Sequence, residues 1–407
     1  MNTTALDLEA LHPAHASARE ELLDFLVTPE INTAAPDDDA SAFDTPFLER
    51  RTRRIAPRPA LRQVMLHGPA GIGKHHLAES LQHLAPPGEV HVRDVGAAAS
   101  LPESGMVIWI SRSPTPPADA PHRMPRIAMH GFSMLEKRKL AWTHLIPDIC
   151  AHFALDAKEF LREEILDITL SGGMRESGWH GFVDRLSRLC RRRAREIQEV
   201  SDFPIDLFWA HRILGVDALP ADTLDVDLPI GCVHAMMVSS WGGDIARVEA
   251  LHLPGKGRLA VTGAGPQAEM AARVARSRLS ALCRELGVTL EALRELDWHI
   301  HISGPSGPKD GSSLGWPILV AMASALTRNP VGASNAFTGE LSLSGSILSV
   351  GGIVEKALGA ARAGCLNISV PQPDAMCMRA IDTNQLGANL WFVAQDLPAL
   401  SELGLQA

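Results

Sequence analysis

The sequence lacks the cysteine spacing of a disulfide framework or a structural zinc site. Its six cysteines are scattered over 407 residues, and no two form a C-x-x-C pair. Small secreted domains and zinc sites need paired or clustered cysteines. We therefore expect reduced thiols and a cytoplasmic protein. The cysteines are Cys150, Cys190, Cys232, Cys283, Cys365 and Cys377.

The sequence also has no apolar run that approaches the roughly 18 residues of a membrane-spanning helix. Its first residues have neither a basic stretch nor an apolar core, so we expect no signal peptide. The formal net charge of −9 argues against nucleic-acid binding driven by overall charge. The arginines of segment 185–195 would spread over more than one face of a helix, and we interpret them as a solvated or intersubunit face. We expect neither a membrane nor a nucleic-acid partner.

A chain of this length has room for two or three domains with substantial cores. Periodic patterns predict strands at 62–67, 106–110 and 127–129, and a helix over 75–84 after the first strand. Residues 133–200 are expected to be helical, with Pro147 ending one helix. From residue 230 onward, short strand patterns alternate with helices, as in α+β or α/β folds.

The predicted organisation has five parts. They are an N-terminal helix (16–27) and linker over 1–60, an α/β module over 61–132, a helical domain over 133–200, a linker over 201–227, and a last domain over 228–407.

A glycine-rich loop follows the first predicted strand. It fits the pattern G-x-x-x-x-G-K through Gly68, Gly71, Gly73 and Lys74. Between a strand and a helix, such a loop cradles phosphates with backbone N–H groups and the lysine. The next position, where a Ser or Thr hydroxyl would hold Mg²⁺, is His75, and the strand at 106–110 ends without a carboxylate. We therefore expect ATP to bind weakly at most and not to be hydrolysed, the loop serving folding or assembly.

The most informative motifs lie between residues 299 and 370. HIHISGPSGPKDGSSLG, which ends at Gly315, predicts a strand, a glycine-rich loop and the start of a helix. FTGE follows at 337–340 and GGIVEK at 351–356. In this order the motifs resemble the proteolytic domain of the Lon family of Ser–Lys proteases, over residues 228–400. The resemblance implies that Ser313 is the nucleophile and Lys356 its base.

The residue types fit this chemistry. A serine hydroxyl needs a base within hydrogen-bond reach, and a lysine can be that base only when its amine is neutral. Lys356 has apolar neighbours in the sequence, and burial among them would lower its pKa. Gly311 and the helix start that follows it offer N–H groups for an oxyanion. Alone, Ser313 would be interpreted as a helix cap and Lys356 as a solvated lysine, but the whole motif favours catalysis.

The resemblance also implies supporting residues. Thr338 is expected to orient the Lys356 amine, and Asp310, His299 and His301 match positions that shape the site. The two histidines alternate on a predicted strand without a third ligand, so we expect no metal site.

Three positions depart from the family pattern. Ser312 replaces a proline, Leu314 replaces a small alanine, and Trp316 is bulkier than its counterparts. We expect the side chains of Leu314 and Trp316 to narrow the substrate groove or to change its specificity.

The segment before this domain resembles the Lon ATPase module in degraded form. Arg123 matches the arginine finger, whereas His180 stands where the family has a sensor arginine and Ser111-Arg112-Ser113 where it has a sensor asparagine. These losses imply a pseudo-ATPase. The predicted fold class is α/β plus α+β: a truncated AAA+-like α/β module, a helical small domain and a Lon-type α+β proteolytic domain.

The combined prediction is a Lon-like serine endopeptidase that works without ATP and requires no cofactor. By family likeness it forms a homo-oligomeric ring, a hexamer, and without a motor its substrates are unfolded proteins or peptides. Two alternatives stay open. One is an ATP-dependent protease in which Lys74 and Arg123 serve an unusual nucleotide site. The other is a non-catalytic assembly or regulatory subunit whose groove Leu314 and Trp316 block.

Overall fold

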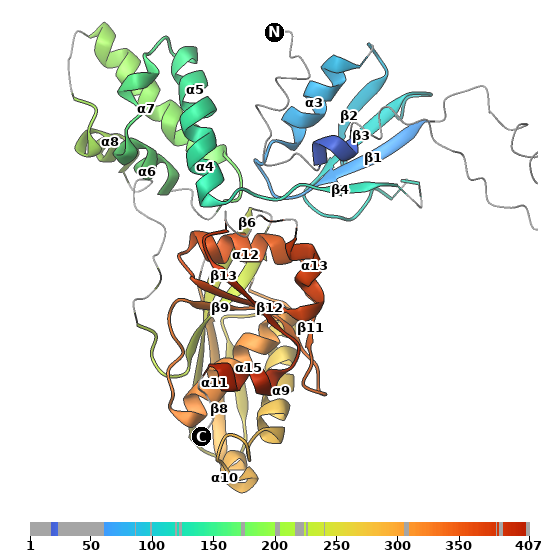
Figure 1. Ribbon diagram of the computed structural model, residues 1–407, viewed down its shortest axis with the longest axis vertical. Helices are drawn as coiled ribbons and strands as arrows, with labels where there is room; N and C mark the ends of the chain where they lie inside the picture. Colours follow the sequence, from blue (N-terminus) through green and yellow to red (C-terminus); the bar gives the residue numbers. More distant parts are fainter. Residues whose placement is uncertain are drawn as a thin grey trace, which may run out of the picture. The chain divides into compact units, whose positions relative to one another are not determined.

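The chain divides into two compact units, residues 1–68 with 73–129 and residues 69–72 with 130–407. The structure is a computed structural model (Figure 1). It describes residues 18–22, 61–85, 87–97, 100–118, 120–121, 124–171, 176–199, 204–215, 224, 227–239, 241–304, 309–379, 381 and 386–403. Of the helix predicted at 16–27, residues 18–22 are described and are helical; the rest lies outside the described residues.

The first unit contains a parallel sheet with the strand order β2-β3-β1-β4. Its elements are β1 (Arg62–His67), α3 (Lys74–Leu84), β2 (Val90–Asp94), β3 (Met106–Ser111) and β4 (Arg126–Ala128). The continuous apolar runs of β1 and β3 are buried, as is usual in a parallel sheet. The three predicted strands are confirmed to within one residue. Strand β2 was missed because its sequence, VHVRD, is polar enough for the sheet edge it occupies.

The second unit begins with a group of helices around one apolar core. They are α4 (Met134–Leu140), η2 (Ala141–Leu145), α5 (Ile146–His152), η3 (Ala157–Glu159), α6 (Glu163–Ser171), α7 (His180–Gln198) and α8 (Leu207–Leu214). The arginine-rich helix α7 buries an apolar stripe that includes Phe182, Leu186 and Leu189, and most of its arginines lie outside that stripe.

Two expectations for this region are wrong. Pro147 does not end a helix, because it lies in the first turn of α5 directly after the π-helical turn η2. In that turn the Ile146 N–H bonds to the Ala141 carbonyl, five residues back, and such a wide turn accommodates a proline without an N–H. The predicted linker at 201–227 contains helix α8, whose Trp209 is buried in the helical core.

The rest of the second unit is built on a mixed seven-stranded sheet with the order β13-β12-β9-β5-β6-β8-β7. Its strands are β5 (Cys232–Ser239), β6 (Gly242–Pro254), β7 (Leu259–Thr262), β8 (Leu296–Ser303), β9 (Asn335–Phe337), β12 (Asn367–Pro371) and β13 (Asn389–Val393). A hairpin of β10 (Glu340–Leu341) and β11 (Ile347–Leu348) lies beside it. Parallel and mixed sheets with helices confirm the α/β and α+β fold class in outline.

Helices cover both faces of this sheet. They are α9 (Pro266–Ala281), α10 (Leu290–Arg294), η5 (Ser312–Leu314), α11 (Gly315–Thr327), α12 (Ile353–Arg362), η6 (Gln372–Asp374), α13 (Ala375–Met378) and α15 (Asp396–Glu402). Alternate residues of β5 enter different cores: Val233 and Ala235 pack with α9 and α11, and Met236 packs with α12. Helix α11 is apolar on all sides and is the centre of the larger core. No helix among the described residues is long and apolar enough to cross a membrane.

Candidate active site

The predicted nucleophile lies where a glycine-rich loop enters helix α11. Gly311 has a φ of 147°, a conformation that favours glycine, and it precedes the short helix η5 that contains Ser313. The Gly339 N–H donates to the Ser313 carbonyl at 3.0 Å, and the Trp316 N–H donates to the Gly339 carbonyl at 3.0 Å. Ser313 is partly exposed. The fold thus holds this serine firmly while leaving it open to solvent.

The predicted base is buried on helix α12. Lys356 is 3% exposed, and its Nζ lies 3.3 Å from the hydroxyl oxygen of Thr338, which is fully buried. Burial lowers the pKa of Lys356 from 10.5 to about 8, against an opposing effect of Asp374. A substantial fraction of this amine is therefore neutral near physiological pH.

One short segment connects the two groups. Thr338 contacts the Lys356 amine, and the next residue, Gly339, donates its N–H to the Ser313 carbonyl and accepts the Trp316 N–H. The Thr338 N–H donates to the Ser369 carbonyl of β12 at 3.2 Å, which fixes this segment against the sheet. Ser313, Thr338 and Lys356, which are far apart in the sequence, are thereby brought to one place.

Asp310 and Ser312 support the loop from either side of Gly311. The Asp310 carboxylate accepts the Ala268 N–H at 2.9 Å in the first turn of α9, so it caps that helix and ties the loop to it. The Ser312 hydroxyl donates to the Glu340 carboxylate. Ser312, which stands where the Lon family has a proline, is thus hydrogen-bonded to the FTGE motif at 337–340.

Leu314 and Trp316 do not line a groove, and the expectation that they narrow or block one is wrong. Both are 0% exposed and belong to the large core. The Trp316 indole N–H donates to the Ser369 hydroxyl at 3.2 Å, and its ring packs edge-on to Phe337 with centroids 6.3 Å apart. Their larger volume fills the interior beneath the nucleophile, where the sequence pattern could not place it.

Comparison with known proteins finds similarity in the part of the chain that contains Ser313, Thr338 and Lys356. The Lon protease (S16) C-terminal proteolytic domain family matches residues 208–394. Residues 208–394 form a Lon-type proteolytic domain. The chain is 31% identical over 266 residues to the Lon protease of Heliobacterium modesticaldum, covering 64% of this chain and 33% of that protein. It is 30% identical over 284 residues to the Lon protease of Escherichia coli K12, covering 69% and 36%. The chain therefore spans about a third of the length of these curated relatives.

His299 and His301, two residues apart in the Lon-type domain, lie on the exposed face of strand β8. His299 Nε2 and His301 Nδ1 are 3.0 and 2.8 Å from the Thr262 hydroxyl of β7. Within the described residues, no hydrogen bond links either of them to Ser313 or Lys356, so their role in shaping the site stays a prediction. No group of three metal-ligating side chains occurs among the described residues.

Glu355, next to Lys356 in the Lon-type domain, is a site residue to which sequence reasoning gave no role. It is buried, and its two carboxylate oxygens accept the Gly131 N–H at 2.6 Å and the Ser177 hydroxyl at 2.7 Å. Burial alone would raise the pKa of Glu355, but His130 and these two hydrogen bonds hold it below its usual value. The helical region therefore binds the helix that carries Lys356, one residue away from the amine.

A second buried charge binds the other end of the same helix. Arg362 donates to the Gly243 carbonyl at 2.9 Å and to the Phe132 carbonyl at 3.4 Å. Helix α12 is thus held at both ends by polar groups of its surroundings. The motif GGIVEK contained Glu355, but the sequence offered no sign of these distant partners.

Replacing Glu355 with glutamine is expected to lower the free energy of unfolding by about 1–3 kcal/mol, because charge-assisted hydrogen bonds become neutral ones. The measurement is urea unfolding at pH 7, with the exposed Glu402→Gln variant as control. Because the carboxylate has a lowered pKa, this difference should disappear as the pH falls below the usual value of 4.5 and the wild-type side chain also becomes neutral. A difference that does not shrink as the pH falls from 4.5 to 3 would contradict the charge-based explanation.

The glycine-rich loop from Gly68 to Lys74 has positive-φ glycines, as phosphate-binding loops do, but the side chains of Lys74 and the neighbouring His75 contact groups of the protein itself. Gly71 and Gly73 have φ values of 73° and 93°, and the Lys74 ammonium donates to the Gly68 carbonyl at 2.8 Å. His75, at the position of the Mg²⁺-binding hydroxyl, pairs with Asp94, Nε2 to Oδ1, at 2.9 Å.

Residues 178–180 pack against the part of this loop that belongs to the second unit. The Trp179 N–H donates to the Gly71 carbonyl at 3.0 Å, and a Cβ at Gly178 would lie 2.4 Å from the Ala70 carbonyl oxygen. His180, at the sensor-arginine position, is the nearest side chain to Gly71. Arg123 lies outside the described residues. This part of the loop therefore packs against residues 178–180.

Proposed function

We propose that this protein is a serine endopeptidase in which Ser313 is the nucleophile and Lys356 its general base. The observation that carries the proposal is the burial of the Lys356 amine against Thr338, with Ser313 bound to the adjacent Gly339. Burial supplies the lowered pKa that a lysine base requires, and Thr338 restrains the amine. The Lon-type domain over 208–394 gives independent support.

In the proposed reaction, the neutral Lys356 amine takes the proton of the Ser313 hydroxyl as Oγ attacks the substrate carbonyl. The first turn of η5 leaves backbone N–H groups without helical partners, and these stabilise the oxyanion. The Lys356 ammonium then gives its proton to the leaving amine, which leaves an acyl-Ser313 ester. Water, deprotonated by the same amine, hydrolyses the ester and restores both side chains.

We further propose that cleavage requires no ATP and no other cofactor. The support is the exposed His75–Asp94 pair at the Mg²⁺ position and the packing of residues 178–180 on the loop. In this proposal the first unit is a truncated AAA+-like pseudo-ATPase that serves assembly. Without a motor the enzyme would take unfolded proteins or peptides. A homohexameric ring is proposed by likeness to the family, and a cytoplasmic location from the six unpaired cysteines.

The pH dependence of cleavage without nucleotide tests this function. With an unfolded protein such as α-casein as substrate, kcat/KM is expected to rise about tenfold per pH unit up to about pH 8 and then level off, because only the neutral amine is a base. Adding ATP and Mg²⁺ should change the rate less than twofold. An absent cleavage activity would remove the peptidase proposal, and a requirement for ATP would remove the pseudo-ATPase proposal.

A further inference from the structure

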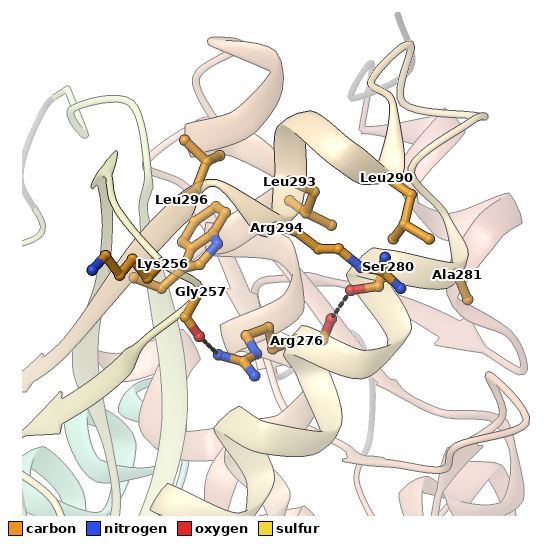
Figure 2. Close-up of a pocket in the computed structure, with 10 residues that line it drawn as sticks. Lys256, Gly257, Arg276, Ser280, Ala281, Leu290, Leu293, Arg294 and Leu296 are labelled. Carbon is orange, nitrogen blue, oxygen red and sulfur yellow. Dashed lines mark hydrogen bonds between the residues drawn. The ribbon is translucent and has the colours of Figure 1, made fainter.

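A cavity of about 630 Å³ lies in the Lon-type domain, outside the site described above. It is bordered by α9, α10, the start of β8 and the turn between β6 and β7 (Figure 2). Figure 1 shows α10 and α12 at opposite ends of this domain, so the cavity is remote from the Lys356 amine.

Every charged side chain that lines the cavity is basic. These side chains are Lys256, Arg276 and Arg294. One N–H of Arg276 bonds to the Gly257 carbonyl, which fixes the guanidinium at the wall (Figure 2). Among the described residues, neither Lys256 nor Arg294 has an ion-pair partner.

Two carboxylates, Glu295 and Asp297, lie close to Arg294 in the sequence, and among the described residues neither forms an ion pair with Lys256, Arg276 or Arg294. Asp297 accepts the backbone N–H groups of Lys256 and Arg258 at 2.8 and 2.7 Å, and these hydrogen bonds lower its pKa. It therefore closes the turn between β6 and β7, and the cavity keeps an excess of positive charge.

The remaining wall is mostly apolar, and the Ser280 hydroxyl that also lines it donates to the Arg276 carbonyl at 3.0 Å. Leu290, Leu293 and Leu296 line the cavity together with the ring of Trp298. Trp298 is 2% exposed, and its indole N–H has no hydrogen-bond partner among the described residues.

We propose that this cavity binds an apolar carboxylate. Its carboxylate would lie between the Arg276 and Arg294 guanidinium groups, whose forked N–H donors match two oxygens, and its apolar body would lie on the leucines. A highly charged polyanion is disfavoured because half of the wall is hydrocarbon. Two sources supply this chemistry, a free organic acid or the C-terminal carboxylate of a polypeptide that ends in an apolar residue.

The test is calorimetric titration of the full-length Ser313→Ala protein with octanoate, so that binding is measured apart from cleavage. We expect saturable binding by octanoate and none by the neutral octanamide. Arg294→Gln and Arg276→Gln should each weaken binding about tenfold, as the loss of a charge-assisted hydrogen bond does. Arg273→Gln, on the same helix α9 but outside the cavity, is the matched control and should bind as before.

A second titration identifies the source. An acetylated tripeptide ending in leucine, with a free carboxylate, is compared with its C-terminal amide. Binding of the acid form alone assigns the cavity to polypeptide ends, whereas binding of octanoate without the peptide assigns it to free organic acids. The proposal would be overturned if Arg276→Gln and Arg294→Gln, each made in the Ser313→Ala protein, bound octanoate as tightly as the Ser313→Ala protein itself. It would also be overturned if no carboxylate bound at millimolar concentration. Neither result depends on whether Ser313 is catalytic.

Discussion

Alanine in place of Ser313 is expected to reduce cleavage of unfolded α-casein by at least about 10³-fold, because no other hydroxyl can form the acyl intermediate. Ser312 is the natural control. It is adjacent in the sequence, but its hydroxyl is engaged with Glu340, so Ser312→Ala should retain most of the activity. Initial rates at pH 8.5, where the amine is mostly neutral, give the comparison.

The base is tested in the same assay. Lys356→Met keeps the length and apolar character of the buried side chain, and should lower kcat by about 10²–10⁴-fold with little change in stability. Lys309→Met, in the same loop as the nucleophile, is the control and should remain active. If Ser312→Ala or Lys309→Met were the inactive variants instead, the assignment of nucleophile and base would be wrong.

The second large effect concerns stability. Trp316 is the largest of the fully buried side chains, and its removal in Trp316→Ala is expected to lower the free energy of unfolding by about 3–5 kcal/mol. The cavity would open directly beneath η5 and would also leave the Ser369 hydroxyl without its indole donor. Urea unfolding followed by circular dichroism measures the loss.

Two variants show whether this tryptophan acts through the core. Trp316→Phe keeps most of the ring volume, so it should recover most of the stability and cleave the same bonds in α-casein as the wild type. Trp241→Ala removes a tryptophan that is 50% exposed and should cost less than about 1 kcal/mol. A changed cleavage pattern in Trp316→Phe at unchanged stability would restore the idea that this residue shapes the groove.

Much of the fold follows from local patterns. The apolar runs of β1 and β3, the loop between β1 and α3, and the strand and glycine-rich loop before Ser313 were all recognisable because each pattern is complete within a few residues. Pro147 and helix α8 were misjudged, because a π-helical turn and burial in a distant core decide those segments. Neither the π-helical turn nor the burial can be predicted from the local sequence preference of the segment.

The candidate site also has parts that the sequence predicts and parts that it does not. Motif order placed Ser313, Thr338 and Lys356 together, and the structure shows contacts that join them through Gly339. The inward direction of Trp316 depends on how α11 is rotated in the core, which an all-apolar helix does not reveal in its sequence. The partners of Glu355 lie about 180 and 220 residues earlier in the chain, beyond any local signal.

The two charged residues at the ends of α12 make the Lon-type domain dependent on the helical region before it. The groups that satisfy Glu355, and one of those that satisfy Arg362, come from residues 131, 132 and 177, all upstream of residue 208 where the Lon-type match begins. A fragment cut at that point would retain every proposed catalytic side chain. It would nevertheless leave Glu355 without these partners and Arg362 with the Gly243 carbonyl but without the Phe132 carbonyl, so helix α12 would be held less firmly. We therefore expect that the Lon-type domain cannot be excised at residue 208 without loss of stability.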